Sequence, residues 1–147
     1  MADMSISIDG ATRILQKLDG LAEFLKDPKD TLEEIGDFGI EEVDQQFATE
    51  GTRLDKKWKS LAKNTQRQKA MMGYGSKGIL ERTGALRRSV IKETTKLKVT
   101  IKSTSKIAEY HQLGMGYNPQ RKIFATPQNF KGNVVEIINK GIRSKIA

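Results

Sequence analysis

A stripe of apolar residues near the start of the chain, at the spacing of one α-helix face, constrains the fold more than any other sequence feature. The stripe consists of Ala11, Ile14, Leu15, Leu18, Leu21, Ala22 and Leu25. Apolar residues three and four apart lie on one side of a helix, because an α-helix turns once every 3.6 residues. The spacing predicts an amphipathic helix from Ala11 to the Asp27-Pro28 break.

A second helix is predicted from the segment after Asp27 to about Ala48. Pro28 suits a first helical turn, and Asp30 and Glu33 have the spacing of a capping box. Its inner face would carry Leu32, Ile35, Gly39, Val43 and Phe47. The opposite face is nearly all carboxylate. Gly36 and Gly39 weaken a helix, so we expect them to permit close packing against another backbone.

The rest of the chain combines short helical and extended patterns. We expect a strand at 5–8, a helix from Ser60 to about Met71, a glycine-rich mobile loop at 72–78, a helical turn at 83–89, a hairpin of strands 90–93 and 97–103, a helix at 106–113 closed by Gly114, and a last amphipathic helix from Thr126. These elements predict an α+β fold, in which a small antiparallel β-sheet packs against long amphipathic N-terminal and C-terminal helices. We expect a single domain over residues 1–147, with residues 1–50 as an acidic helical part and residues 51–147 as a basic α+β part.

The charge is distributed unevenly between these two parts. The net charge is +8, but residues 1–50 hold 13 acids and four bases, whereas residues 51–147 hold five acids and 22 bases. The two parts therefore carry net charges of −9 and +17. Three interpretations stay open: solvated faces that keep the protein soluble, a basic face for nucleic acid, or a bipolar subunit whose acidic side meets the basic side of a neighbour.

The inventory of chemically active side chains is small. There is no cysteine, and His111 is the only histidine, so thiolate sites and histidine metal clusters are excluded. A lone histidine is more often a hydrogen-bonded structural group than a catalyst. The glycine-rich loop lacks the P-loop pattern, and no stretch approaches the roughly 20 apolar residues of a membrane span. We therefore expect a soluble, unprocessed protein with no catalytic residues, no cofactor, no metal ion and no membrane contact.

A basic segment around Trp58 and Tyr74 favours contact with nucleic acid. Its bases are Lys56, Lys57, Lys59, Lys63, Arg67, Lys69, Lys77, Arg82, Arg87 and Arg88. Clustered positive side chains suffice for phosphate contacts, but they carry no sequence preference. Trp58 stands three residues before Leu61, a spacing more typical of a core anchor than of a base-stacking platform.

Four short motifs in order resemble the virion-morphogenesis or tail-completion proteins of long-tailed phages and prophages. They are a Trp-x-x-Leu followed by a threonine, a Leu-x-x-Thr-Gly-x-Leu-x-x-Ser, a His-Gln-x-Gly and a Pro-x-Arg-x-x-Phe. The matching residues are Trp58, Leu61, Thr65, Leu80, Thr83, Gly84, Leu86, Ser89, His111, Gln112, Gly114, Pro119, Arg121 and Phe124. The resemblance covers roughly residues 47–125, and Lys122 departs from it because many relatives have proline there.

The resemblance implies an α+β structural protein without catalytic activity. It implies a homo-oligomeric ring, with sixfold symmetry suggested, in the tail or neck of a bacteriophage virion, where the protein would serve tail completion or head-tail joining. Its partners would then be copies of itself and other phage tail, neck or connector proteins. A basic surface facing the lumen could also contact phage DNA without sequence preference. The alternative is a sequence-nonspecific DNA-binding accessory protein.

Several residues have expected roles within such an assembly. The interface between copies is expected to use Glu41, Glu42, Asp44, Arg87, Arg88 and Arg121. Gly84 would permit a turn that a Cβ would strain, with Leu80 and Leu86 packed beneath it. Arg121 would pair with a carboxylate, either inside the subunit or across the interface. Trp58 would be either a core anchor or an interface hot spot.

Overall fold

The computed structural model describes residues 9–126 and 128–147, so the strand expected at residues 5–8 lies outside the described residues. The elements in order are α1 (Asp9–Lys26), α2 (Lys29–Ala48), α3 (Lys63–Met71), α4 (Ala85–Arg88), β1 (Val90–Thr94), β2 (Val99–Ser103), α5 (Lys106–Leu113) and α6 (Phe130–Ile146). The predicted α+β class is confirmed. The helix that covers the sheet is α2, because both strands pack against it.

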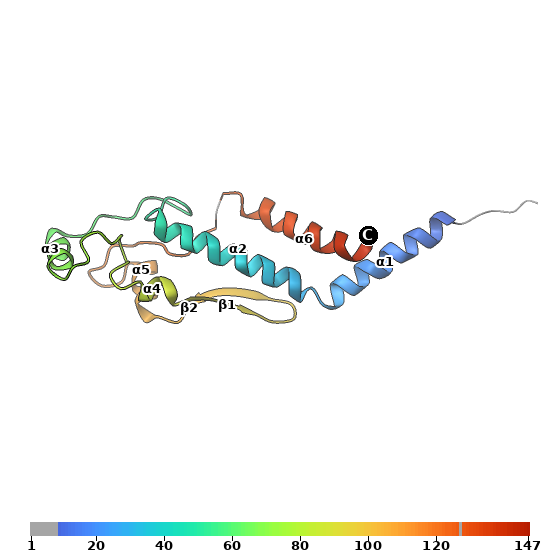
Figure 1. Cartoon of the computed structure of the whole chain (residues 1–147), viewed down its shortest axis with the longest axis horizontal. Coiled ribbons are helices and arrows are strands. Elements are labelled where there is room, and N and C mark those ends of the chain that lie inside the picture. The colour runs from blue at the N-terminus through green and yellow to red at the C-terminus, as the bar shows by residue number, and fades with distance from the viewer. Residues whose placement is uncertain (1–8, 127) are drawn as a thin grey trace, which may run out of the picture.

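Helix α2 forms the long axis of an elongated molecule (Figure 1). The hairpin β1–β2 lies along one side of α2, and α6 lies along the other. Helix α1 turns away at Pro28, contacts the end of α6 and extends beyond it. Helices α3, α4 and α5 gather at the opposite end. The two ends of the subunit are therefore built from different parts of the chain.

The hairpin and the helix after it form where local patterns predict them. Strands β1 and β2 pair antiparallel, from Val90 opposite Ser103 to Thr94 opposite Val99. Helix α5 begins with a side-chain cap, since Ser105 Oγ accepts a hydrogen bond from the backbone N–H of Ile107 at 3.3 Å. It ends at Gly114, whose φ of +68° is the left-handed conformation that glycine adopts without strain.

The two glycines in the middle of α2 permit close packing, as predicted. A Cβ on Gly36 would lie 2.9 Å from Val99 Cγ2, and one on Gly39 would lie 3.0 Å from Ile101 Cγ1. Both distances are shorter than ordinary van der Waals contact. The close neighbours are side chains of β2 rather than another backbone, so the glycines allow the sheet to lie directly on α2.

Two predicted helix starts and one predicted cap are wrong. Helix α2 begins at Lys29 with Pro28 at its N-cap, and no side chain caps it, so the capping box at Asp30 does not form. Helix α3 begins at Lys63, not at Ser60. Helix α6 begins at Phe130, after Asn129, rather than at Thr126. Local cap patterns therefore did not locate the starts of α3 and α6.

The apolar face of α1 is largely exposed. Ile14, Leu15, Leu18 and Leu25, here called the α1 stripe, are 55–63% exposed. Helix α1 instead contacts α6 through a neighbouring face that holds Gly20 and the buried Phe24. A Cβ on Gly20 would overlap the carbonyl oxygen of Lys145, so glycine is what lets the two helices approach. The stripe itself has no partner among the described residues.

The hydrophobic core lies at the end of α2 remote from α1. Its buried members are Val43, Phe47, Trp58, Ile79, Ala108 and Ile123. The molecule exposes 10897 Å² of surface, whereas a compact monomer of 16.5 kDa would expose about 7,500 Å². The larger exposed area agrees with the elongated shape in Figure 1.

Candidate functional site

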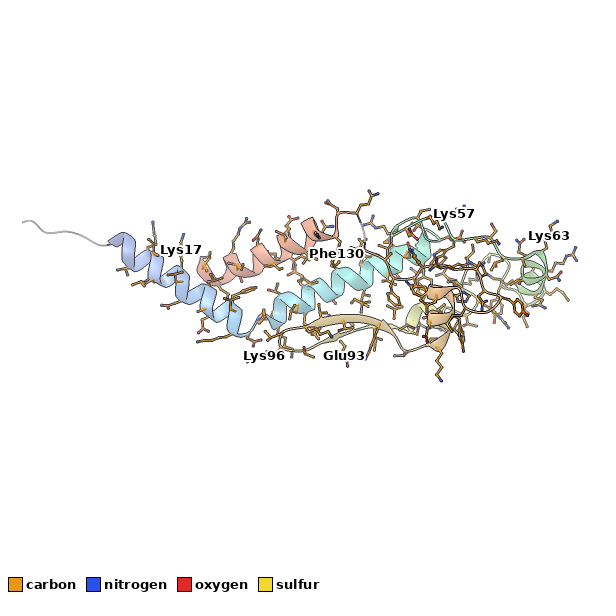
Figure 2. The ribbon with its side chains drawn as sticks, turned by 180° about the vertical axis from the view of Figure 1, so that it is seen from behind. Lys17, Lys57, Lys63, Glu93, Lys96 and Phe130 are labelled. Carbon is orange, nitrogen blue, oxygen red and sulfur yellow. The ribbon has the colours of Figure 1, made fainter. Side chains whose placement is uncertain are left out.

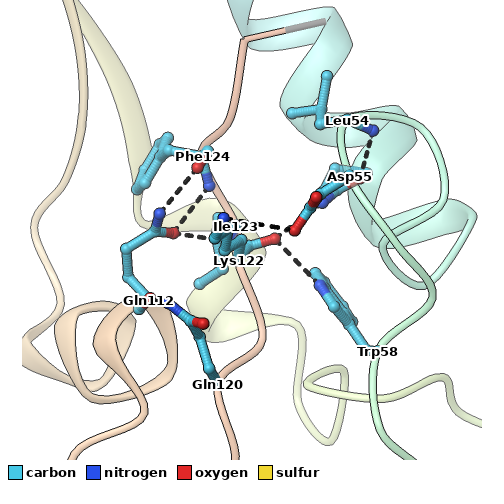
Figure 3. A network of polar contacts seen from close by, with 9 residues as sticks. Leu54, Asp55, Trp58, Gln112, Gln120, Lys122, Ile123 and Phe124 are labelled. Carbon is cyan, nitrogen blue, oxygen red and sulfur yellow. Dashed lines mark hydrogen bonds and ion pairs between the residues drawn. The ribbon is translucent and has the colours of Figure 1, made fainter.

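Gln112 binds the extended segment that crosses the core (Figure 3). Its Oε1 accepts hydrogen bonds from the backbone N–H groups of Ile123 at 2.8 Å and Phe124 at 2.9 Å. Its Nε2 donates to the carbonyl oxygen of Phe124 at 2.7 Å. One side chain thus satisfies three backbone groups of a segment that no strand pairs with.

The carbonyl oxygen of Lys122 accepts two hydrogen bonds from the opposite side. Trp58 Nε1 donates to it at 3.0 Å and Gln46 Nε2 at 2.8 Å. Trp58 is buried, with its ring edge-to-face on Phe47 at a centroid distance of 5.6 Å. These contacts make Trp58 a core anchor within the subunit. The N–H of Lys122 makes no hydrogen bond among the described residues, so a proline at this position would lose none.

Sequence reasoning missed Gln46, which is fully buried. Besides its contact with Lys122, its Oε1 accepts a hydrogen bond from the backbone N–H of Leu54 at 2.8 Å. It therefore joins the loop after α2 to the extended segment. A polar residue between Val43 and Phe47, on the inner face of a predicted helix, was the available signal, because a buried amide requires partners for both ends.

Arg121 is buried, and its partners are carbonyl oxygens rather than a carboxylate. Its Nε donates to the carbonyl oxygen of Lys59 at 2.9 Å and its Nη2 to that of Ser60 at 3.3 Å. Burial lowers the pKa of the guanidinium. The expected carboxylate pair is absent within the described part of the subunit. Because Arg121 holds residues 59 and 60 outside a helix, it also explains why α3 starts later than predicted.

Gly84 forms the predicted turn. It adopts φ +75° at the N-cap of α4, and both Leu80 and Leu86 are half-buried against the core. Leu80 itself has φ +62°, which is uncommon for a non-glycine residue and indicates that tertiary packing determines the turn. Ser89 Oγ bonds the carbonyl oxygen of Leu86 at 2.5 Å and Ser103 Oγ at 2.7 Å, so it links α4 to the hairpin.

The remaining motif residues divide between core and surface. Leu61 and Phe124 are half-buried against the core, and Pro119 is half-buried nearby. Thr65 and Thr83 are exposed. The Trp-x-x-Leu, Leu-x-x-Thr-Gly, His-Gln and Pro-x-Arg motifs therefore meet around one structural core, although they are far apart in sequence.

His111 lies beside this core with its Nδ1 buried and without a hydrogen-bond partner among the described residues. Its backbone carbonyl accepts a hydrogen bond from the N–H of Arg121 at 2.7 Å. Burial, and next the positive charge of Arg121, lower the pKa of the imidazole below its ordinary value of 6.5. The side chain is thus stabilised in its neutral form, which indicates a structural group.

This pKa shift predicts that stability falls on acidification. A histidine whose pKa is lower in the folded than in the unfolded protein binds its proton more readily when the protein is unfolded. Its stabilisation of the folded protein is therefore complete above pH 6.5 and decreases as the pH falls through 6.5 toward the folded pKa. The free energy of unfolding, measured with urea at pH 7.5 and 5.5, should decrease less in His111→Asn than in the wild type. Equal losses in both proteins would show that His111 is not the group responsible.

The carboxylates expected at a subunit interface are mostly paired inside the subunit. Glu42 is buried and accepts two hydrogen bonds from Arg53, at 2.9 and 2.6 Å. Arg87 bonds both Asp44 and Glu81, at 2.5 Å each, and the bond from Arg87 lowers the pKa of Asp44. Only Glu41 among the three acids is exposed without an ion-pair partner in the described chain.

The acidic face of α2 is further neutralised by other elements of the same subunit. Lys92 on β1 pairs with Glu33 at 2.7 Å and Asp37 at 2.5 Å. Lys140 on α6 pairs with Glu34 at 2.7 Å. Most of these pairs are exposed, so each contributes little to stability. As a consequence, these carboxylates of α2 form ion pairs with the hairpin and with α6 of the same chain.

Basic side chains without a carboxylate partner among the described residues gather at the α3 end of the molecule. They are Lys56, Lys57, Lys59, Lys63, Arg67, Lys77, Arg82 and Arg88. Figure 2 shows Lys57 and Lys63 at this end, opposite Lys17 on α1. Lys69 in the same region is buried. Its Nζ donates to the carbonyl oxygens of Lys77 at 2.9 Å and Gly78 at 2.8 Å, and these two bonds hold the end of the 72–78 loop against α3.

A second exposed apolar surface lies around α5. It consists of Ile107, Tyr110, Leu113, Met115 and Tyr117, here called the α5 surface, all at least 42% exposed. Beside it, between β2 and α5, lies a groove of about 480 Å³, whose apolar lining includes Ile101, Ala108, Leu113 and Phe124. The α5 surface and the α1 stripe lie toward opposite ends of the molecule (Figure 1).

Within residues 9–126 and 128–147, no three histidine or acidic side chains are close enough to hold a metal ion. In the same residues, no helix is long and apolar enough to cross a membrane. A pocket of about 530 Å³ lies between α3 and the loop after it, and its charged lining consists of Glu50, Arg67, Lys69 and Lys77. Positive side chains therefore predominate in this pocket.

The chain was compared with known families and proteins. The model of the phage virion morphogenesis family matches residues 9–136. No curated protein and no solved structure matches the chain.

Proposed function

The chain belongs to the phage virion morphogenesis family, and on this premise we propose that it is a structural subunit of a homo-oligomeric ring at the tail or neck of a bacteriophage. In this role it would complete the tail or join it to the head, in contact with other tail, neck or connector proteins. The proposed role is structural and not enzymatic, and six subunits is the number we propose.

The observation that carries this proposal is the α1 stripe. Four large apolar side chains stand more than half exposed on one face of a helix that projects from the body. A contiguous apolar surface on a soluble protein commonly marks a site of association, because its exposure to water is unfavourable. The large exposed area of the subunit and its second apolar surface support the same role.

The charged residues expected at the interface support this role less than the apolar ones. Glu42, Asp44 and Arg87 have partners inside the subunit, and Arg121 is buried. Reversing the charges of Glu42 and Asp44 would therefore disturb the fold as well as any interface. Glu41 and Arg88 remain exposed and free to form ion pairs with a neighbouring copy.

A stop codon at Trp58 in the parent phage tests the proposed role. Electron microscopy of the lysate should show filled heads beside unjoined or irregular tails. Supplying the intact chain from a plasmid should restore complete virions, which controls for effects on neighbouring genes. Intact infectious virions from the mutant without the plasmid would contradict the proposal.

A second candidate function, nonspecific DNA binding, is favoured by the free basic side chains of the α3 end. Eight positive side chains at one end of a subunit, without a carboxylate partner among the described residues, would attract a phosphate backbone, and most carboxylates of α2 are already paired with other side chains. In a ring, this end would contact DNA if it faced the lumen. A free accessory protein would use the same surface.

This candidate predicts weak, steeply salt-dependent binding to duplex DNA of any sequence. Replacing Lys57, Lys63 and Arg67 by alanine should make the slope of log K against log salt shallower by up to about 0.9 for each lost phosphate contact. Replacing Lys131, Arg143 and Lys145 on α6 removes the same charge elsewhere and should change the slope little. Binding that ignores salt or prefers one sequence would contradict the candidate.

A further inference from the structure

The α1 stripe has the form of a helix that inserts into a groove. Ile14, Leu18 and Leu25 follow one another at intervals of four and seven residues, with Leu15 beside them, so the four exposed side chains lie along one side of the helix. Amphipathic helices that bind grooves use anchors at this spacing. The helix carries three acids and three bases, a net charge of zero, so apolar burial and not charge would drive its docking.

The groove between β2 and α5 has the complementary form. Its volume of about 480 Å³ is lined by Ile101, Ala108, Leu113 and Phe124, and Leu113 also belongs to the exposed α5 surface. Lys102, Lys106 and Glu109 also line it, so both signs of charge are present. The groove therefore does not present charge of a single sign to a helix whose net charge is zero.

We propose that the α1 stripe of one copy docks in the β2–α5 groove of the next copy, a contact that rests on the proposed ring. The two surfaces lie toward opposite ends of the subunit, so one subunit cannot join its own (Figure 1). A second copy can, and a head-to-tail contact of this kind repeats until the ring closes.

The head-to-tail contact covers both the α1 stripe and the groove, which is why it is preferred to pairing of two α1 helices. An α1–α1 pair would bury the stripe on both partners and leave Leu113 at the groove in water. The head-to-tail contact removes the stripe and the groove residues from water with one interface. Since apolar burial is the main favourable term in association, the arrangement that buries more of it is favoured.

Disulfide crosslinking can test this contact directly, because the chain has no cysteine of its own. The variant with both Leu18→Cys and Leu113→Cys, oxidised and run on a non-reducing gel, should give a ladder of covalent multimers. Each single variant should remain monomeric on the gel. Both replaced leucines are more than half exposed, so the fold should persist, and circular dichroism would verify it.

The matched control is Leu18→Cys with Met71→Cys, because Met71 on α3 is 88% exposed and outside the groove. It should give no ladder. Dimers from Leu18→Cys alone, or no ladder from the Leu18→Cys/Leu113→Cys variant, would overturn the proposed contact. Light scattering of the unmodified protein distinguishes failure of this contact from failure of the proposed ring. If the unmodified protein is oligomeric but the double-cysteine variant gives no ladder, only this contact is refuted. If the unmodified protein is monomeric at every concentration, the ring is refuted as well.

Discussion

Replacing Trp58 by alanine is expected to lower the free energy of unfolding by about 3–5 kcal/mol. The side chain is only 4% exposed, its ring packs edge-to-face on Phe47, and its Nε1 donates to the carbonyl oxygen of Lys122. Alanine would leave a cavity and an acceptor with one partner fewer. Because small domains have about 5–15 kcal/mol of stability in total, much of the population should unfold under mild denaturant.

Urea unfolding followed by circular dichroism measures this loss. Met71→Ala truncates a large apolar side chain at a position that is 88% exposed, and should change stability by less than about 0.5 kcal/mol. The experiment also separates the two roles considered for Trp58. A Trp58→Ala protein that keeps its monomer stability but no longer oligomerises would make Trp58 an interface residue and contradict its assignment to the core.

Replacing both Ile14 and Leu18 by glutamate is expected to abolish oligomerisation while the subunit stays folded. Both side chains are more than half exposed in the subunit, so glutamate there meets water and should change the free energy of unfolding by less than about 0.5 kcal/mol. In an interface the same carboxylates would lose water without gaining a partner, at a cost of at least about 3 kcal/mol. That cost corresponds to a rise of roughly 100-fold in Kd.

Sedimentation velocity at several concentrations measures this effect. Leu97→Glu is the control, because Leu97 is an exposed apolar residue of the hairpin turn, 72% accessible, and belongs to neither apolar surface. It should leave assembly intact. Assembly that survives in the Ile14→Glu/Leu18→Glu variant would exclude the α1 stripe from the interface and remove the main support for the ring proposal.

Local patterns predicted much of the fold. The break at Pro28, the end of α2 at Ala48, the hairpin and the span of α5 are all confirmed. Each depends on interactions between residues close in sequence: a turn, an alternation of polar and apolar residues, or a glycine at a helix end. The start of α6 was missed, and the start of α3 was missed because its position depends on a distant segment. For α3 the distant group is Arg121, which holds the carbonyls of residues 59 and 60.

The motif residues were identified from the sequence, but the contacts that they make were not. The motif residues Trp58, Gln112 and Arg121 do meet at one core. Residue types do not specify partners, however, because a guanidinium binds carbonyl oxygens as well as carboxylates. Gln46 was missed for the same reason: its importance comes from accepting a bond from Leu54 and donating to Lys122, 76 residues away in sequence.

The order of side chains along the backbone sets helix periodicity and charge pattern. It therefore predicted that α1 is an amphipathic helix, that α2 carries an acidic face and two close-packing glycines, and that the chain has an α+β fold. Which helix faces are covered depends instead on packing between distant segments. Gly20 and Phe24, not the apolar stripe, contact α6, and Lys92, Arg53 and Arg87 neutralise acids within the subunit. A periodic pattern identifies a face that avoids water, but three-dimensional packing determines whether the same subunit or another molecule covers it.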